Sequence, residues 1–241
     1  MYDDTDGQEQ VISGYADTSE LPPELLKRTQ ANYSGLVTMC DRWFGHLYET
    51  MRVEGLLENT LLIVTTDHGH SIGDKNYMGK RGYPSSPEVY DVPLFIRHPE
   101  GVGAGKKSAL FVNHTDMAAA ILEAAGVEPP QAIDGRRFWD AAVEDGEPIR
   151  DHVTVAWGSA VTVIDDRWWL NCKVDGRGAF LYDLTTDAPF DTNVADDSRD
   201  AVSELFAKAV EDAGGGFPDF IMELAKGEAD APGCSALAAR G

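Results

Sequence analysis

Two side chains that can bind a metal ion stand next to each other after an apolar run. Asp67 and His68 follow residues 61–64 and two threonines, and Gly69 comes next. A carboxylate oxygen suits Ca²⁺, Mg²⁺ or Mn²⁺, and an imidazole nitrogen favours Mn²⁺ or Zn²⁺. Because Gly69 lets the backbone turn sharply, both side chains can point at one ion. An Asx turn beside an ordinary histidine would give the same pattern, so the pair predicts part of a metal site.

A lysine follows on the same loop, between two glycines. The ammonium group of Lys80 can bind an oxygen of a tetrahedral anion and stabilise the charge that develops in a transition state. The alternative is a lysine that simply faces solvent, as most loop lysines do.

The segments that must position these residues alternate as in an α/β fold. Residues 61–64 predict a strand buried on both faces, as in parallel sheets, whose ligands bind outside the carboxyl ends of the strands. A long helix precedes this strand, from the proline pair at 22–23 to about residue 53. It carries one apolar stripe that should be buried, and Cys40 lies on it as a predicted core residue.

Further strands and one helix follow the loop. Residues 90–97 are predicted to contain a second buried strand, and residues 108–112 to form a short one. Thr115 or Asp116 would cap a helix that ends at Gly126.

After Pro129 and Pro130 the pattern changes to short strands with turns between them, which is typical of a smaller antiparallel sheet. The predicted strands are residues 153–157, 160–164, 168–174 and 179–182, with a hairpin turn at 175–178. Residues 199–213 and 218–225 predict two terminal helices.

The charge balance limits the partners. A net charge of −21 argues against nucleic acid and anionic membrane surfaces and indicates a solvated acidic surface, as in halophilic proteins. An anionic substrate would then need a locally positive site. The N-terminus is acidic, unlike a signal peptide, and no apolar run reaches the ~20 residues of a membrane span. With three scattered cysteines, these features predict a cytoplasmic protein in a reducing compartment.

The order and spacing of the motifs resemble the sulfatases of the alkaline phosphatase superfamily. The resemblance rests on residues 57–70, 72–74, 79–80, 88 and 92–99, and it extends to residues 31–41, 114–127, 134–136 and 181–184. It implies an α/β fold: a partial alkaline-phosphatase-like mixed or parallel sheet with helices, plus a small C-terminal α+β subdomain with an antiparallel sheet. Residues 1–140 would be the C-terminal part of the catalytic domain. Residues 141–241 would be the antiparallel-sheet subdomain with its terminal helix.

The same resemblance implies roles for single residues. Asp67 and His68 match the second pair of metal ligands, with Ca²⁺ the expected ion and Mn²⁺ or Mg²⁺ the alternatives. Lys80 matches the lysine that contacts the sulfate and the leaving oxygen. His70 would face the substrate or be an ordinary loop histidine, and Glu88 would support the ligands from behind.

One departure from the family is as informative as the matches. Sulfatases use a Cys or Ser in Cys/Ser-x-Pro-x-Arg, oxidised to formylglycine, as the nucleophile. The nearest match, at residues 85–89, has Val89 in place of the arginine. We therefore expect a metal-dependent sulfatase that acts on sulfate esters but is incomplete. We expect one of three explanations: the gene model starts late, the chain is a fragment, or a partner chain supplies the nucleophile.

Two other functions stay open. One is a phosphatase, phosphodiesterase or phosphonate hydrolase of the same superfamily. The other is a truncated, non-catalytic module, which predicts no metal binding and exposed apolar patches where missing strands would pair.

Overall fold

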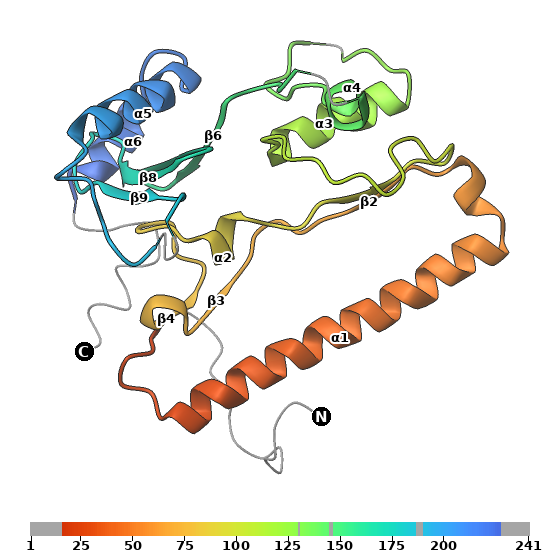
Figure 1. Cartoon of the computed structure of the whole chain (residues 1–241), viewed down its shortest axis with the longest axis horizontal. Helices are drawn as coiled ribbons and strands as arrows, with labels where there is room; N and C mark the ends of the chain where they lie inside the picture. Colours follow the sequence, from red (N-terminus) through yellow and green to blue (C-terminus); the bar gives the residue numbers. More distant parts are fainter. Residues whose placement is uncertain (1–15, 130, 145–146, 187–189, 228–241) are drawn as a thin grey trace. The chain divides into compact units, whose positions relative to one another are not determined.

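The computed structural model of the chain describes residues 16–129, 131–144, 147–186 and 190–227, which form two compact units (Figure 1). The first unit runs to Arg81 and resumes from Pro87 to Gly105; the second holds Gly82–Ser86 and the chain from Lys106 onward. The units are defined by contacts and do not test the predicted division near residue 140, which stays a prediction.

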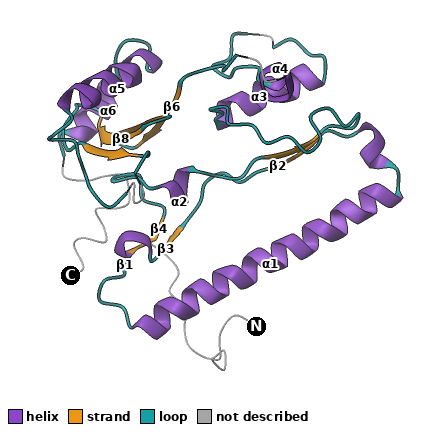
Figure 2. Ribbon diagram, in the orientation of Figure 1, coloured by secondary structure: helices purple, strands orange, loops and turns teal. Residues whose placement is uncertain are grey.

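The first unit combines a long helix with two small antiparallel sheets (Figure 2). Strands β1, β4 and β3 form one sheet in that spatial order, and β2 pairs with β5 in the other. The elements are β1 (Ala16–Asp17), α1 (Pro23–Val53), η1 (Leu56–Asn59), β2 (Leu62–Val64), β3 (Ser71–Ile72), η2 (Asp74–Asn76), β4 (Tyr77–Gly79), α2 (Pro87–Tyr90) and β5 (Phe95–Arg97).

Helix α1 confirms the predicted long helix, but not the burial of its apolar stripe. Its first turns hold the buried Arg28 and Thr29. Further along, Leu36 and Trp43 are 56% and 67% exposed, and Cys40 is exposed as well, so its assignment to the core was wrong. Helical periodicity shows that one face needs a cover, but it does not say which residues supply that cover.

Strand β2 forms where it was predicted, with a different partner and less burial. It is half-buried and pairs antiparallel with β5, with Val64 opposite Phe95, whereas a parallel, fully buried strand was predicted. β5 lies within residues 90–97, where a strand was predicted, but it is not buried, since Phe95 is 67% exposed. Residues 108–112 form no strand. A short apolar run indicates a strand but carries no information on the direction of its neighbour.

The second unit is built on a four-stranded antiparallel meander, which confirms the predicted C-terminal strands and helices. The strand order is β6-β7-β8-β9. Its elements are α3 (His114–Ala124), α4 (Trp139–Glu144), β6 (His152–Trp157), β7 (Ala160–Asp165), β8 (Trp168–Lys173), β9 (Phe180–Asp183), α5 (Arg199–Asp212) and α6 (Asp219–Ala225). None of the helices in the described ranges has the length and hydropathy to cross a bilayer.

The hydrophobic core of this unit lies between one face of the meander and helices α5 and α6 (Figure 1). Val161 and Val163 of β7 alternate with Thr162, so the valines enter the core while the threonine lies on the opposite face. The fully buried members of this core include Val163, Leu170, Cys172, Leu181 and Ala209.

The opposite face of the meander holds the five-residue segment Gly82–Ser86. Ser85 accepts hydrogen bonds from the Thr162 hydroxyl at 2.9 Å and from Trp169 Nε1 at 3.0 Å, and its N–H donates to Asn171 Oδ1 at 3.0 Å. A Cβ on Gly82 would lie 2.2 Å from the Trp157 ring. Buried polar groups therefore fix this segment in one position on the sheet.

Helix α3 begins two or three residues earlier than predicted and is capped by a different residue. Asn113 is the N-cap and accepts from Thr115 N–H, and Asp116 completes the capping box by accepting from Asn113 N–H. The predicted caps, Thr115 and Asp116, thus lie inside the first turn.

Candidate functional site

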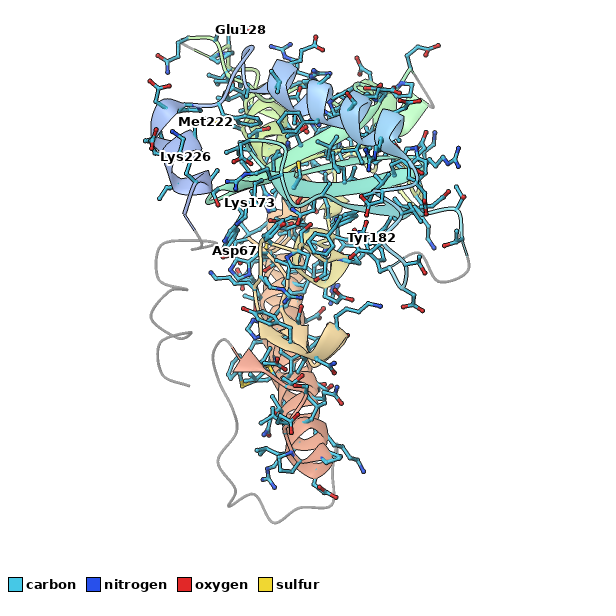
Figure 3. All side chains as sticks on the ribbon, turned by 90° about the vertical axis from the view of Figure 1, so that its left-hand side faces the viewer. Asp67, Glu128, Lys173, Tyr182, Met222 and Lys226 are labelled. Atoms are coloured by element: carbon cyan, nitrogen blue, oxygen red, sulfur yellow. The ribbon has the colours of Figure 1, made fainter. Side chains whose placement is uncertain are left out.

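Asp67, His68 and Lys80 lie together in the first unit (Asp67 is labelled in Figure 3). Asp67 and His68 follow the end of β2, and Lys80 follows directly after β4. Lys80 Nζ is 2.9 Å from His68 Nε2, and Asp67 Oδ2 is 3.3 Å from the same nitrogen. The structure thus brings together the three residues that carry the predicted chemistry.

The partners of His68 define which ring nitrogen carries its proton. Nδ1 lies 2.8 Å from the carbonyl oxygen of Gly69, which can only accept, so Nδ1 donates. Lys80 Nζ can only donate, so Nε2 accepts from it. When the ring is neutral, these contacts favour the tautomer with a lone pair on Nε2, the form in which histidine binds metals.

The carboxylate of Asp67 is ionised and accessible. Its side chain is 81% exposed, and Oδ1 accepts from His68 N–H at 3.0 Å and from the Thr66 hydroxyl at 3.3 Å. Partial desolvation acts to raise the pKa of Asp67, but these hydrogen bonds and the His68 ring outweigh it and hold the pKa below its ordinary value. The group is therefore a ready oxygen ligand at neutral pH.

Gly69 is required because another stretch of backbone passes against it. Its N–H donates to the carbonyl of Val89 at 2.8 Å, and a Cβ at position 69 would lie 1.8 Å from the carbonyl oxygen of Glu88. The sequence suggested a sharp turn, whereas the structure shows a close approach between the Asp67–His68 segment and α2. Glycine keeps this segment in register with residues 88–89.

The structure shows what His70 and Glu88 contact, but the roles predicted for these two residues remain predictions. The His70 ring stacks on Tyr33 of α1, with ring centroids 6.4 Å apart and planes 20° apart. Burial, together with the nearby His68 and Lys80, lowers the pKa of His70. The Glu88 side chain is exposed, and its observed contact with the site is through its backbone carbonyl.

Residues that hold this region in place were not recognised from the sequence. Thr66 bonds to Asp67 Oδ1 and to the carbonyl of His68, and Gln30 of α1 donates to the carbonyl of Ile72 at 2.9 Å. The Arg81 guanidinium lies 4.4 Å from the centre of the Tyr77 ring. Only Thr66 had a sequence signal, since it belongs to the polar cluster that ends β2.

The donor set fits two ligands of a divalent ion. Ligands at right angles on an ion with bonds of about 2.1–2.4 Å lie about 3.0–3.4 Å apart, and the 3.3 Å between Asp67 Oδ2 and His68 Nε2 falls in this range. Within the described part of the chain, no group of three or more His, Cys, Asp or Glu residues could hold a metal ion. The identity of the metal therefore stays a prediction.

Known proteins match both the sequence and the fold. The family model described as Sulfatase matches residues 2–127, more than half of the chain. The multifunctional alkaline phosphatase superfamily protein PehA of Trinickia caryophylli is 35% identical over 51% of this chain and 24% of its own length. An arylsulfatase of Clostridium perfringens is 26% identical over 64% of this chain and 35% of its own.

Among solved structures, the phosphonate monoester hydrolase of Agrobacterium radiobacter has a TM-score of 0.68 and 28% identity, over 80% of this chain and 42% of its own. The chain thus spans about a quarter to two fifths of the length of these three relatives. The fold that this chain shares with the solved hydrolase confirms the predicted α/β class. The chain belongs to the sulfatase family of the alkaline phosphatase superfamily.

Proposed function

We propose that this chain supplies one part of the active site of a hydrolase that cleaves sulfate esters. Asp67 and His68 would be two ligands of a divalent cation, with Ca²⁺ the expected ion, and Lys80 would bind the anionic group of the substrate. The observation that carries the proposal is the 2.9 Å contact between Lys80 Nζ and His68 Nε2 beside the Asp67 carboxylate.

The local charge suits an anionic substrate in spite of the acidic chain. With a net charge of −21, the chain as a whole repels anions. Lys80, with Arg81 next to it, places positive charge beside His68, and a bound cation would add more. When bound, the cation would neutralise charge on the sulfate and activate the nucleophile.

The reaction needs a group that the printed sequence does not contain. In sulfate ester hydrolysis an oxygen nucleophile attacks sulfur, the bond from sulfur to the ester oxygen breaks, and the alcohol leaves with a proton. Lys80 would stabilise negative charge on the leaving oxygen or donate to it. Because no Cys/Ser-x-Pro-x-Arg occurs among the 241 residues, we propose that another segment supplies the nucleophile.

Phosphonate monoester hydrolysis is the second candidate function. The solved hydrolase with this activity is 28% identical and shares the fold. A phosphonate monoester also presents a singly charged tetrahedral group, so the same contact with Lys80 would serve it. Rates of hydrolysis of p-nitrophenyl sulfate and p-nitrophenyl phenylphosphonate distinguish the two functions.

The first prediction tests Lys80 in a preparation that contains the nucleophile segment. Replacing Lys80→Ala removes the electrostatic contact, and kcat should fall about 100- to 1000-fold, or about 2.7–4 kcal/mol. Steady-state kinetics with both substrates measures the change. Lys27→Ala, at an exposed position on α1, is the matched control and should leave kcat unchanged. Near-normal turnover of the Lys80→Ala protein would remove this residue from the proposed site.

A further inference from the structure

The loop between β4 and α2 leads into the candidate site at both of its ends. Lys80, at its start, contacts His68 Nε2 at 2.9 Å. Helix α2 follows directly after its end, and the carbonyl of Val89 in α2 accepts from the Gly69 N–H at 2.8 Å. Whatever holds this loop in place therefore bears on both contacts, because a shift of the loop would be passed to Lys80 and to α2.

A buried side chain of strand β8 bonds to the middle of this loop. Asn171 Oδ1 accepts from the Ser85 N–H at 3.0 Å, and Asn171 Nδ2 lies 3.3 Å from the carbonyl of Gly82, to which it donates. Asn171 is fully buried, and Gly82 and Ser85 are buried as well. An asparagine amide offers both an acceptor and donors, so this one side chain satisfies two buried backbone groups of the loop.

The same amide belongs to a chain of hydrogen bonds in the interior. Asn171 Nδ2 donates to the Thr162 hydroxyl at 2.9 Å, and this hydroxyl donates to the Ser85 hydroxyl at 2.9 Å. Trp169 Nε1 also donates to the Ser85 hydroxyl, at 3.0 Å. All four residues are at most 4% exposed. A buried network with its members paired rigidifies the segment that it includes.

Tyr83 is a second anchor of the loop. Its hydroxyl donates to the carbonyl of Gly178 at 2.6 Å, and a Cβ on Gly178 would lie 2.0 Å from that hydroxyl oxygen. The Tyr83 ring meets Phe180 edge to face, with centroids 5.5 Å apart, and Lys173 Nζ lies 4.3 Å from its centre. The loop is thus held at residues 82, 83 and 85.

We propose that Asn171 is a positioning residue for the contact between Lys80 and His68, with Tyr83 as a second anchor of the same loop. A lysine ammonium sits on a flexible four-carbon stem, so its position depends on how firmly its backbone is held. Asn171 acts through the loop, since its amide is buried and bonded to residues 82 and 85. This inference rests on the proposed function, which gives Lys80 its role.

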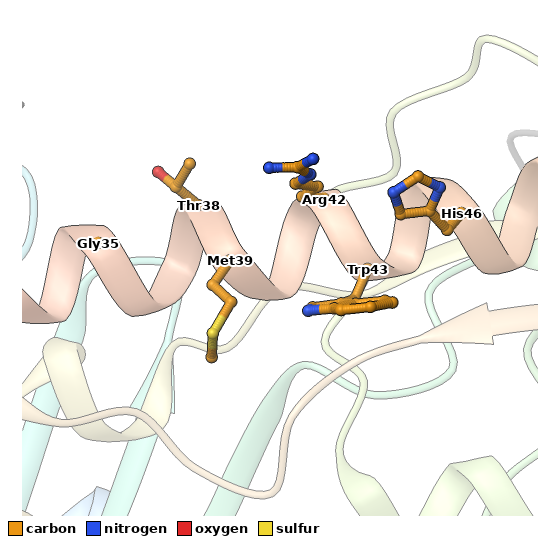
Figure 4. A pocket seen from close by; sticks show the side chains of 6 residues that line it. All are labelled: Gly35, Thr38, Met39, Arg42, Trp43 and His46. Carbon is orange, nitrogen blue, oxygen red and sulfur yellow. The ribbon is translucent and has the colours of Figure 1, made fainter.

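The first test measures hydrogen exchange of the Gly69 N–H in the whole chain, without substrate. In Asn171→Ala the loop loses its bonds to the amide, and we expect this N–H to exchange at least about 10-fold faster through local opening. Leu170→Ala is the matched control, because Leu170 is buried on the opposite face of the meander, in the core. Thr38→Ala, at an exposed position of α1 (Figure 4), is a surface control. Neither control should change the rate measured without urea.

The second test is a double-mutant cycle in a preparation that contains the nucleophile segment. We expect Asn171→Ala to lower kcat by about 10- to 100-fold with little change in KM, as when a partner that orients a functional residue is replaced. In the Lys80→Ala background the same change should lower kcat no further, because no ammonium is left to position. Loss of folded protein would instead lower kcat equally in both backgrounds.

Three results would overturn the positioning role. One is a Gly69 exchange rate that is unchanged in Asn171→Ala, or in Tyr83→Phe if Asn171→Ala does not fold. Another is an equal loss of kcat with and without Lys80. The third is near-normal kcat in Asn171→Ala beside a low kcat in Lys80→Ala. Near-normal kcat in Lys80→Ala itself would reject the proposed function, so the two failures are distinguishable.

Discussion

At the scale of single residues, hydrogen bonds around His68 determine what the site can do. The Gly69 carbonyl fixes the proton on Nδ1, which leaves Nε2 to Lys80 and close to Asp67 Oδ2. A lone pair and a carboxylate that face the same point need a cation between or beside them. In this structure the ammonium of Lys80 meets that need, and a divalent ion bound to Nε2 would displace Lys80 from the single lone pair of that nitrogen.

Gly69 provides a prediction about stability. The mutation Gly69→Ala would place a Cβ 1.8 Å from the Glu88 carbonyl oxygen, so residues 88–89 must move. We expect a loss of about 1–3 kcal/mol in the free energy of unfolding, as for overpacked positions. Urea denaturation measures this loss. Gly45→Ala in α1 meets no atom within 4 Å and should instead stabilise the protein by up to about 1 kcal/mol.

The sequence named three residues that the structure brings together, but it did not predict the geometry of this candidate site. Asp67, His68 and Lys80 could be named because their types and order along the chain carry the chemistry. The contact between Gly69 and α2, 19–20 residues later in the chain, depends on tertiary structure and leaves no local pattern. The role of Thr66 was missed for a similar reason, since a threonine after a strand is common and its hydrogen bonds depend on the turn that follows.

At the scale of elements, a buried ion pair attaches helix α3 to the chain that follows it. Asp116 is fully buried and accepts from both terminal nitrogens of Arg150, from Arg136 N–H at 2.8 Å and from Asn113 N–H at 2.8 Å. Burial acts to raise the pKa of Asp116, but these hydrogen bonds and the charge of Arg150 outweigh it and lower the pKa. The ionised form is therefore the one that the fold stabilises.

This pair predicts a specific acid sensitivity. The stabilisation from Asp116 is present above its unfolded pKa of about 3.9 and is lost as the pH falls through the lower folded pKa. Asp116→Asn should cost about 3–5 kcal/mol at neutral pH, because it leaves Arg150 buried without its charge partner. Below about pH 4, the Tm of the Asp116→Asn protein should also fall less steeply with decreasing pH than the Tm of the unmodified protein. Thermal melts at a series of pH values measure this difference.

The matched control for Asp116 is an ion pair on the surface of the same unit. Glu128 pairs with Arg137 at 2.9 Å, and both side chains are at least half exposed. Glu128→Gln should therefore change the free energy of unfolding by less than about 1 kcal/mol. An equal cost for the two substitutions would contradict the role given to Asp116.

Elements with strong periodicity were predicted well, and their partners were not. Helix α1 and strands β6 to β9 were placed almost to the residue, because helical stripes, strand alternation and the turn around Gly176 are local signals. The direction of the β2–β5 pair and the exposure of Trp43 depend on residues far away in the chain or outside it. The sequence pattern could therefore predict an apolar face but not its cover.

At the scale of the whole molecule, the excess of acidic residues predicts how stability depends on salt. A net charge of −21 produces self-repulsion in the folded state, and KCl screens it, since the Debye length falls from about 10 Å at 0.1 M to about 3 Å at 1 M. We expect the free energy of unfolding to rise between these two KCl concentrations. Each kcal/mol of this rise should increase Tm by roughly 2–4 °C. A Tm that falls as KCl increases would contradict the proposed halophile-like acidic surface.

The most direct measurement of the central claim is a Mn²⁺ titration of the ¹⁵N-labelled chain, followed by paramagnetic broadening of its amide signals. If Asp67 and His68 share a cation beside Lys80, the signals of residues 67–69 and 80 should broaden first. This local effect should disappear in Asp67→Ala and persist in Asp74→Ala, an exposed carboxylate seven residues away. Broadening that spreads over the acidic surface, or that is unchanged in Asp67→Ala, would contradict a metal site at these residues.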